Sequence, residues 1–242
     1  MADFEQLDKL KLESMIGLRG KIAVEIKNIT KVYELGGEKI RALDDVNLKI
    51  EDGAFLAITG PSGSGKTTLA NIIGGLDTPD SGEVLFDGAD IAKMNDQLLS
   101  DYRNKRIGFI FQSFNLQPTL TALENVLIPL IFSHVSPKER RQRAISCLKA
   151  VGLEDRLKHK PGQLSGGQRQ RVCIARALAN APKIIIADEP TGNLDSKKGQ
   201  EIIDLLADLN KQAKMTLIII THDEAVARRA ETVLSIKDGK FS

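Results

Sequence analysis

Short apolar runs of strand length alternate along the chain with segments in which apolar residues recur every three positions. This alternation is typical of a layered α/β fold, in which helices cover a sheet. The continuous apolar runs at residues 184–186 and 217–220 predict strands that are covered on both faces, as in a parallel sheet. The whole pattern predicts strands at residues 22–29, 46–50, 55–59, 84–86, 107–111, 184–187, 217–221 and 232–237.

The first predicted strand has a different pattern from the others. Ile22, Val24 and Ile26 alternate with alanine and glutamate. A strand with one apolar and one polar face is half exposed, and such strands are typical of antiparallel sheets. We therefore expect an N-terminal antiparallel β subdomain beside the parallel sheet.

Helical signals replace strand signals between about residues 113 and 165. Ser136 stands as a helix cap, Pro137 occupies the first turn, and Glu139 follows three residues after the cap, which together mark a helix start. Apolar residues then recur at spacing three until Gly152, a common helix terminator. The pattern predicts an α-helical subdomain inserted into the α/β core.

The segment before residue 22 gives a weaker signal. Phe4, Leu7 and Leu10 stand three positions apart and could line one helix face, whereas the glycines that follow interrupt the pattern,. A helix and an irregular extension both remain open. We therefore divide the chain into an extension of open role at residues 1–21 and one domain at residues 22–242.

Composition narrows the class of protein. The chain has 242 residues, 42% hydrophobic and 27% charged, which is ordinary globular usage. A net charge of only +2 gives no overall attraction to nucleic acid or anionic lipid. The two cysteines suit a reducing compartment, and neither a secretory signal nor a spanning apolar stretch is expected. We expect a soluble intracellular protein that does not bind nucleic acid.

Residues 60–68 carry the strongest chemical signal, because Gly-Pro-Ser-Gly-Ser-Gly-Lys-Thr-Thr fits the pattern G-x-x-x-x-G-K-[ST]. An apolar strand precedes the loop and a helix follows it, as this pattern requires, so a merely glycine-rich turn is a poor alternative. In such loops the backbone N–H groups converge on phosphate oxygens. Lys66 would neutralise the β- and γ-phosphates, and the Thr67 hydroxyl would ligate Mg²⁺. The predicted nucleotide-binding residues here are Gly60, Pro61, Ser62, Gly63, Ser64, Gly65, Lys66, Thr67 and Thr68.

Two carboxylates follow the buried strand predicted at residues 184–187. Asp188 and Glu189 would lie at the carboxyl edge of the sheet, where α/β proteins bind their ligands. Asp188 can hold the Mg²⁺ shell, and Glu189 can orient or deprotonate an attacking water. A solvated acidic turn is the alternative, and the phosphate loop upstream makes it less favoured.

Ser165 and Gln168 form a capping box at the start of a helix whose apolar residues repeat at spacing three,. A capped helix alone needs no double glycine. Gly166 and Gly167 expose backbone N–H groups that a phosphate can approach closely. These four residues are therefore predicted to contact nucleotide.

The run Leu-Ser-Gly-Gly-Gln at residues 164–168, shortly before the acidic pair, resembles the signature of ATP-binding-cassette (ABC) ATPases. The resemblance covers about residues 22–242. It implies an α/β fold with a P-loop NTPase core of the RecA-like type, into which the helical subdomain is inserted. It also implies hydrolysis of ATP with Mg²⁺ as cofactor.

Four further residues receive roles only from this resemblance. Tyr33 matches the aromatic residue that stacks on adenine, although a partly buried core tyrosine is the alternative. Gln112 matches the glutamine that senses Mg²⁺ and the attacking water, His222 the histidine that bonds the γ-phosphate, and Asp195 the loop that crosses between subunits. Glu189, His222 and Gln112 are thus the predicted catalytic residues, with Thr67, Gln112 and Asp188 at the metal.

The resemblance further implies a homodimer closed around two ATP, with each phosphate loop facing residues 165–168 of the partner copy. A separate membrane permease would contact the helical subdomain and the Gln112 loop, which places the protein on the cytoplasmic face of the cell membrane. Residues 71–77, 117–125 and 191–196 look like the lipoprotein-releasing and macrolide-export branch. Alternatives are a mechanical ATPase of the cell-division type, a cytosolic ATPase acting on DNA or ribosomes, and a small-molecule kinase.

Overall fold

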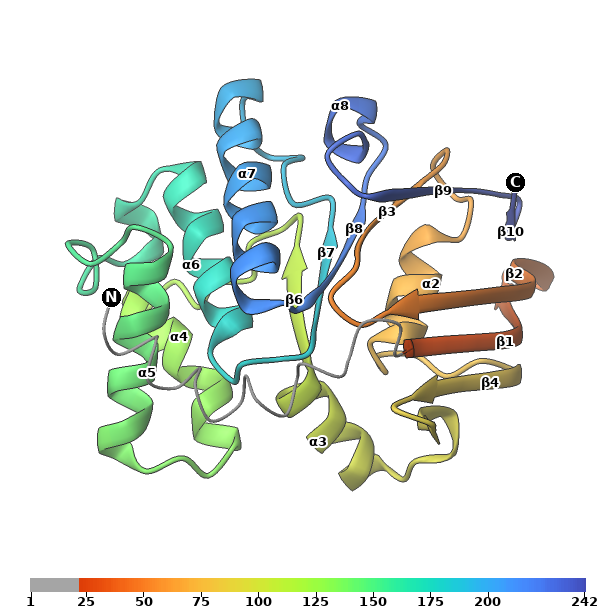
Figure 1. The fold of residues 1–242 in the computed structure, drawn as a ribbon, viewed down its shortest axis with the longest axis horizontal. Helices are drawn as coiled ribbons and strands as arrows, with labels where there is room; N and C mark the ends of the chain where they lie inside the picture. Colours follow the sequence, from red (N-terminus) through yellow and green to blue (C-terminus); the bar gives the residue numbers. More distant parts are fainter. Residues whose placement is uncertain (1–21) are drawn as a thin grey trace.

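The computed structural model describes residues 22–242, which form two sheets and a set of helices (Figure 1). The larger sheet has six strands in the order β10-β9-β3-β8-β7-β6. Neighbours from β9 to β6 run parallel, and the short β10 is antiparallel to β9. Its strands are β3 (Phe55–Thr59), β6 (Ile107–Phe111), β7 (Ile184–Asp188), β8 (Thr216–Ile220), β9 (Thr232–Lys237) and β10 (Lys240–Phe241).

The central strands of the larger sheet are buried on both faces, as their apolar runs predict. In β7, Ile185 and Ala187 join an apolar cluster on one face, and Ile184 and Ile186 join a second cluster on the other face. Successive side chains of a strand point to opposite faces, which explains this division. The first cluster packs against the helices that follow β6, and the second packs against helix α2 (Lys66–Ile73) and the smaller sheet.

The smaller sheet has four antiparallel strands in the order β2-β1-β4-β5, which confirms the predicted antiparallel subdomain. Its first two strands are longer than predicted. Register shifts between them break the strict alternation of apolar and polar residues, so the pattern ends before the pairing does. The strands are β1 (Ile22–Leu35), β2 (Glu38–Glu51), β4 (Ser81–Phe86) and β5 (Ala89–Asp90).

Helix α5 begins as the sequence predicts: the Ser136 hydroxyl accepts a hydrogen bond from the Glu139 backbone N–H, and Pro137 lies in the first turn. Figure 1 shows α4 and α5 beside α6, away from the smaller sheet. The segment predicted as a helical subdomain contains α4, α5 and η2, and its limits as a domain stay a prediction. The remaining helices are η1 (Ile91–Lys93), α3 (Asp96–Arg106), α4 (Ala122–Phe132), α5 (Pro137–Ala150), η2 (Pro161–Gln163), α6 (Gly166–Leu178), α7 (Ser196–Ala213) and α8 (Glu224–Ala227).

Within residues 22–242, no helix has both the length and the apolar composition that a bilayer crossing requires. The prediction that Phe4, Leu7 and Leu10 could line a helix face falls on residues 1–21, outside the described residues.

Candidate functional site

The predicted phosphate loop connects β3 to α2 at the carboxyl edge of the parallel sheet. Two of its glycines are required by close backbone packing. A Cβ on Gly60 would lie 2.1 Å from the Ile236 carbonyl oxygen, and one on Gly65 would lie 2.3 Å from the Ala42 carbonyl oxygen. Both residues also have positive φ angles, 150° and 104°, which favour glycine. The loop is therefore held in one shape by its neighbours.

Helix α2 begins without a side-chain cap, because its N-cap residue is Gly65. In each other α-helix of the described region, a side chain at the N-cap accepts a backbone hydrogen bond. The first N–H groups of α2 thus remain open to an anion, and the positive end of the helix dipole favours one. This is the backbone arrangement that binds phosphate.

Lys66 is the charged side chain of this loop, and only 8% of it is exposed. Its ammonium donates hydrogen bonds to the carbonyl oxygens of Gly60 at 2.9 Å and Pro61 at 2.7 Å. An ammonium has three donors, so one remains for a ligand. The buried Ser64 hydroxyl beside it has no hydrogen-bond partner among the described residues. Both groups fit a bound phosphate.

Thr67 and Asp188 meet across the sheet edge. The Thr67 hydroxyl donates to a carboxylate oxygen of Asp188 at 3.1 Å. Burial raises the pKa of Asp188, and the neighbouring Glu189 adds to that rise, while Thr67 and Lys66 oppose it. A hydroxyl and a carboxylate in contact are suitable ligands for Mg²⁺, which keeps waters and phosphate oxygens in its shell. Within residues 22–242, no group of three or more histidine, cysteine or acidic side chains is placed so that it could hold a metal ion by itself.

Glu189 follows Asp188 with a positive φ of 48°, which turns its carboxylate toward the end of β8. One carboxylate oxygen accepts from the His222 backbone N–H at 3.1 Å and lies 2.7 Å from His222 Nδ1. The Thr221 hydroxyl donates to the other oxygen at 3.4 Å. Because Nδ1 is engaged, Nε2 of the exposed ring is left to meet a ligand.

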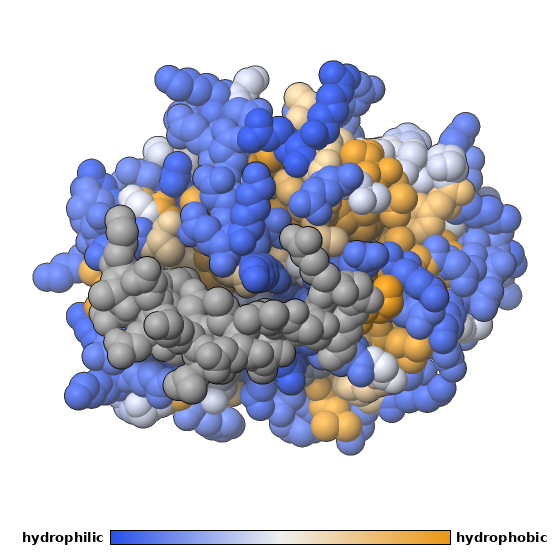
Figure 2. All heavy atoms as spheres, in the orientation of Figure 1, coloured by the Kyte–Doolittle hydropathy of each residue, from blue (hydrophilic) through white to orange (hydrophobic). Residues whose placement is uncertain are grey.

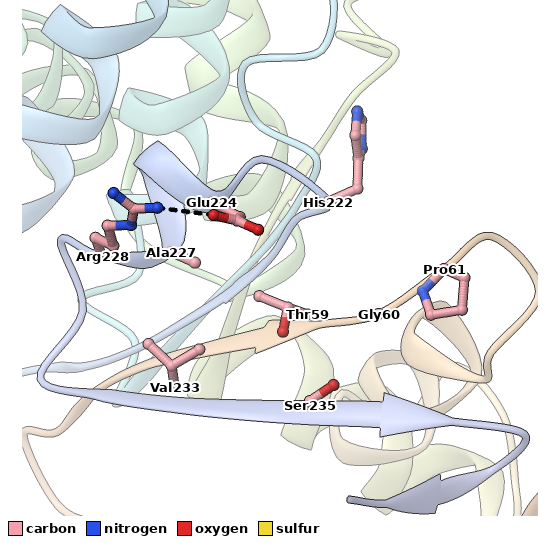
Figure 3. Close-up of a pocket in the computed structure, with 9 residues that line it drawn as sticks. All are labelled: Thr59, Gly60, Pro61, His222, Glu224, Ala227, Arg228, Val233 and Ser235. Atoms are coloured by element: carbon pink, nitrogen blue, oxygen red, sulfur yellow. Dashed lines mark hydrogen bonds and ion pairs between the residues drawn. The ribbon is translucent and has the colours of Figure 1, made fainter.

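A hollow beside the loop brings Gly60 and Pro61 next to His222 (Figure 3). Its far wall contains Val233 on β9 and an ion pair between Arg228 and Glu224 at 2.7 Å. Figure 2 shows apolar atoms gathered between α8 and β9 on a largely hydrophilic face. Gly60 and Pro61 of the phosphate loop therefore face an accessible surface hollow.

The contact between Glu189 and His222 predicts how the His222 ring titrates. Hydrogen bonding and the negative charge of Glu189 raise the pKa of His222 above its ordinary value. Glu189→Gln removes the charge that favours the protonated ring, so the pKa of His222 should fall toward about 6.5. Proton NMR can follow this, since the chain has three histidines and His222→Gln assigns the signal. An unchanged titration curve in Glu189→Gln would contradict the contact.

Gln112 follows β6 directly and packs against the segment that leads to Asp195. Asn193 donates from its side-chain amide to the Gln112 carbonyl oxygen at 2.7 Å, and a Cβ on Gly192 would lie 2.7 Å from Gln112 Nε2. Asp195 itself caps α7 by accepting from the Lys198 N–H at 3.0 Å. Two predicted site residues far apart in the sequence are thus linked through one short segment.

Ser165 and Gln168 form the predicted capping box at the start of α6. The nearest neighbours of the two glycines are Leu194 for Gly166 and Lys198 for Gly167, not residues of the phosphate loop. Figure 1 shows the central strands between α6 and α2. The structure therefore brings the 165–168 segment to Asp195, and it does not bring it to Lys66 of the same chain.

Tyr33 lies on β1, half-buried rather than in the apolar core. Its hydroxyl donates to Asp77 at 2.6 Å, and the Lys31 ammonium lies 5.2 Å from the ring centroid. Sequence reasoning gave Lys31 and Asp77 no role at the site, because they stand 46 positions apart and the run at residues 71–77 was used only to indicate the branch of the family. Contacts of β1 with the segment that follows α2 bring them together.

A family model and the curated relatives indicate the same family. The family described as ABC transporter matches residues 43–192. The uncharacterized ABC transporter ATP-binding protein MJ0796 of Methanocaldococcus jannaschii is 54% identical over 221 residues, 90% of this chain and 94% of the relative. The lipoprotein-releasing system ATP-binding protein LolD of Syntrophus aciditrophicus is 46% identical over 218 residues, 90% of this chain and 98% of the relative.

Solved structures extend the likeness to three dimensions. The dimeric structure of MJ0796, a bacterial ABC transporter cassette, gives a TM-score of 0.83 at 53% identity and covers 90% of this chain and 96% of that chain. A dimeric post-hydrolysis state of the same cassette, bound to ADP and Pi, gives the same values. The predicted α/β fold with a P-loop NTPase core is confirmed.

Proposed function

Because the chain belongs to the ABC transporter family, we propose that two copies of it close around two MgATP and drive a separate membrane-spanning permease. As a member of this family, the chain is an ATPase that uses ATP and Mg²⁺. One observation carries the proposal. Lys66, Asp188, Glu189 and His222 gather at one edge of the sheet, whereas residues 165–168 contact other parts of the chain.

Each residue at the sheet edge has a distinct task in this proposal. Lys66 neutralises the β- and γ-phosphates, and Thr67 with Asp188 would hold Mg²⁺, which neutralises further charge on the phosphates when bound. Glu189 orients and deprotonates the attacking water. His222 bonds the γ-phosphate through Nε2, the ring nitrogen that Glu189 leaves unused.

The second half of each site comes from the partner copy. Residues 165–168 begin α6 with two glycines, so a phosphate can approach the helix N-terminus closely. Asp195 lies beside that segment and would reach the same boundary. The dimeric structures of the similar cassette MJ0796 support a dimer. ATP then holds two copies together, and hydrolysis releases them.

The permease would contact the helices at residues 113–165 and the loop at Gln112, which places the protein on the cytoplasmic face of the cell membrane. Gln112 is bonded through Asn193 to the segment that ends at Asp195, so a shift at the partner boundary reaches the permease side. The likeness to LolD and the matching residues 71–77, 117–125 and 191–196 support an export or lipoprotein-release type.

Affinity purification of the chain from its own membranes tests the permease. A co-purifying membrane protein with a substrate passage is the expected result. A membrane partner that transmits force or a signal without such a passage would instead support the cell-division type of ATPase.

Ser165→Ala tests the division of the site between two copies. We expect ATP turnover to fall at least about 10-fold, as one charge-assisted hydrogen bond contributes roughly 1.5–3 kcal/mol, while monomer affinity for ATP stays unchanged. Ser165 also caps α6, so Ser136→Ala, which removes the cap of α5, is the matched control for lost capping. Equal loss of affinity and turnover in Ser165→Ala would show that the segment acts within its own chain.

A further inference from the structure

A cluster outside the phosphate loop joins β1 to the end of α2. Asp77 accepts a hydrogen bond from the Tyr33 hydroxyl at 2.6 Å on one carboxylate oxygen, and from the Lys31 ammonium at 2.8 Å on the other. The Thr78 backbone N–H donates to the second oxygen as well, at 2.7 Å. Both oxygens of Asp77 are therefore occupied by groups of this chain.

The carboxylate is itself held in place. The Asp77 backbone N–H donates to the Asn71 carbonyl oxygen at 3.3 Å, so Asp77 is attached to the last turn of α2. The Lys31 ammonium bonds the Thr78 carbonyl oxygen at 2.7 Å in addition to Asp77. One short helix thus has the phosphate loop at its start and this anchor just beyond its end.

Charge and burial favour a lasting contact. Lys31 is only 9% exposed, and an unpaired ammonium at such a site would be costly. Burial alone would raise the pKa of Asp77, but hydrogen bonds from Lys31, Tyr33 and the Thr78 backbone together lower it. Asp77 therefore remains a carboxylate at neutral pH, which is the strongest acceptor available for a tyrosine hydroxyl.

These contacts fix the position of the Tyr33 ring. Its hydroxyl is engaged by Asp77, and the Lys31 ammonium lies over the ring, 5.2 Å from its centroid. A ring held at its backbone and at its hydroxyl loses little freedom when a ligand stacks on it, so less entropy is lost on binding. The Tyr33 hydroxyl also bonds the side chain of Thr68 in the first turn of α2, whereas the contacts of Asp77 lie at the other end of that helix.

We propose that Asp77 is a positioning residue for nucleotide binding, which fixes the Tyr33 ring as a preformed platform for the purine base. This inference rests on the proposed function and on the expectation, taken from the resemblance to ABC ATPases, that the base stacks on Tyr33. It predicts that Asp77 strengthens binding of the base and contributes nothing to binding of the phosphates.

The test compares MgADP with magnesium pyrophosphate, which carries the same two phosphates without the nucleoside and is not hydrolysed. Calorimetric titration should show that Asp77→Ala weakens MgADP binding about 3- to 10-fold, as expected for ordering one side chain on binding, with pyrophosphate affinity unchanged. Tyr33→Phe removes the hydroxyl without disturbing Lys31 and should give a similar loss. The double variant should lose little more than either single one.

Asp87→Ala is the matched control, because Asp87 also pairs with a lysine, Lys183 at 2.8 Å, away from Tyr33. Tyrosine emission gives an independent readout, since the chain has two tyrosines and no tryptophan. Freeing the Tyr33 hydroxyl from a carboxylate should change that emission in Asp77→Ala, and Tyr33→Phe assigns the change.

Two results would overturn the inference while leaving the proposed function intact. One is that Asp77→Ala binds MgADP as tightly as Asp87→Ala does, while the separate variant Tyr33→Ala binds MgADP more weakly than the wild type. The other is an equal loss of MgADP and pyrophosphate affinity, which would show a merely structural role. A wild-type protein that does not prefer MgADP over pyrophosphate would instead contradict the expected stacking of the base on Tyr33 and leave the proposed function untouched.

Discussion

Glu189→Gln should retain ATP binding and reduce hydrolysis by about 10²- to 10⁴-fold, the usual contribution of a general base. A glutamine keeps the shape of the side chain, and its carbonyl oxygen can still accept from the His222 backbone N–H,. It cannot take a proton from water. ATP should therefore persist between two copies, and light scattering with MgATP should report a stable dimer that dissociates without nucleotide.

Glu201→Gln is the control for Glu189→Gln, because Glu201 is an exposed carboxylate on α7 with one long ion pair to Arg171 at 3.8 Å. Its turnover should match the wild type. Near-normal phosphate release from Glu189→Gln would remove Glu189 from its role. Loss of ATP binding in that variant would show that the change damages the site rather than the chemistry.

Lys66→Met should weaken MgATP binding by about 10- to 100-fold, since each hydrogen bond from a charged group contributes roughly 1.5–3 kcal/mol and the Lys66 ammonium has one donor left for phosphate. Methionine keeps the apolar stem of the buried side chain and removes only the ammonium. Calorimetric titration with MgATP measures the loss, and thermal unfolding followed by circular dichroism shows whether the fold survives.

Lys183→Met provides the comparison for Lys66→Met, since Lys183 also holds its ammonium in local contacts, with both oxygens of Asp87. It should bind MgATP like the wild type. Undiminished MgATP affinity in Lys66→Met would contradict the assignment of residues 60–68 as the phosphate site.

The core strands could be predicted from the sequence because burial on both faces leaves a plain signal. The continuous apolar runs of β7 and β8 are strands, and the capping residues before α5 and α6 mark their first turns correctly. Helix α3 gave no usable pattern, since Tyr102 is its one buried residue. Helix α7 was also missed, although Ile202, Ile203 and Leu206 form a clear buried face.

The motifs predicted which residues could act, and the structure adds how they are held. The Thr67–Asp188 contact was expected from their shared role at Mg²⁺. The hydrogen bond between Glu189 and the His222 ring was not expected. That contact depends on the left-handed backbone of Glu189, which no sequence pattern indicates. The contact of Tyr33 with Asp77 was missed because it joins segments that stand 44 positions apart in the sequence.

The division of the apolar interior by the larger sheet has a mechanical consequence. Leu130 of α4 and Leu148 of α5 belong to one cluster, whereas Leu69 of α2 and Ile58 of β3 belong to the other. A tilting of α4 and α5 would therefore disturb mainly the first cluster, whereas the apolar anchor of α2 lies in the second. If α4 and α5 contact the permease as proposed, substitutions on one face of the larger sheet would change their motion, and substitutions on the other face would change the strength of ATP binding.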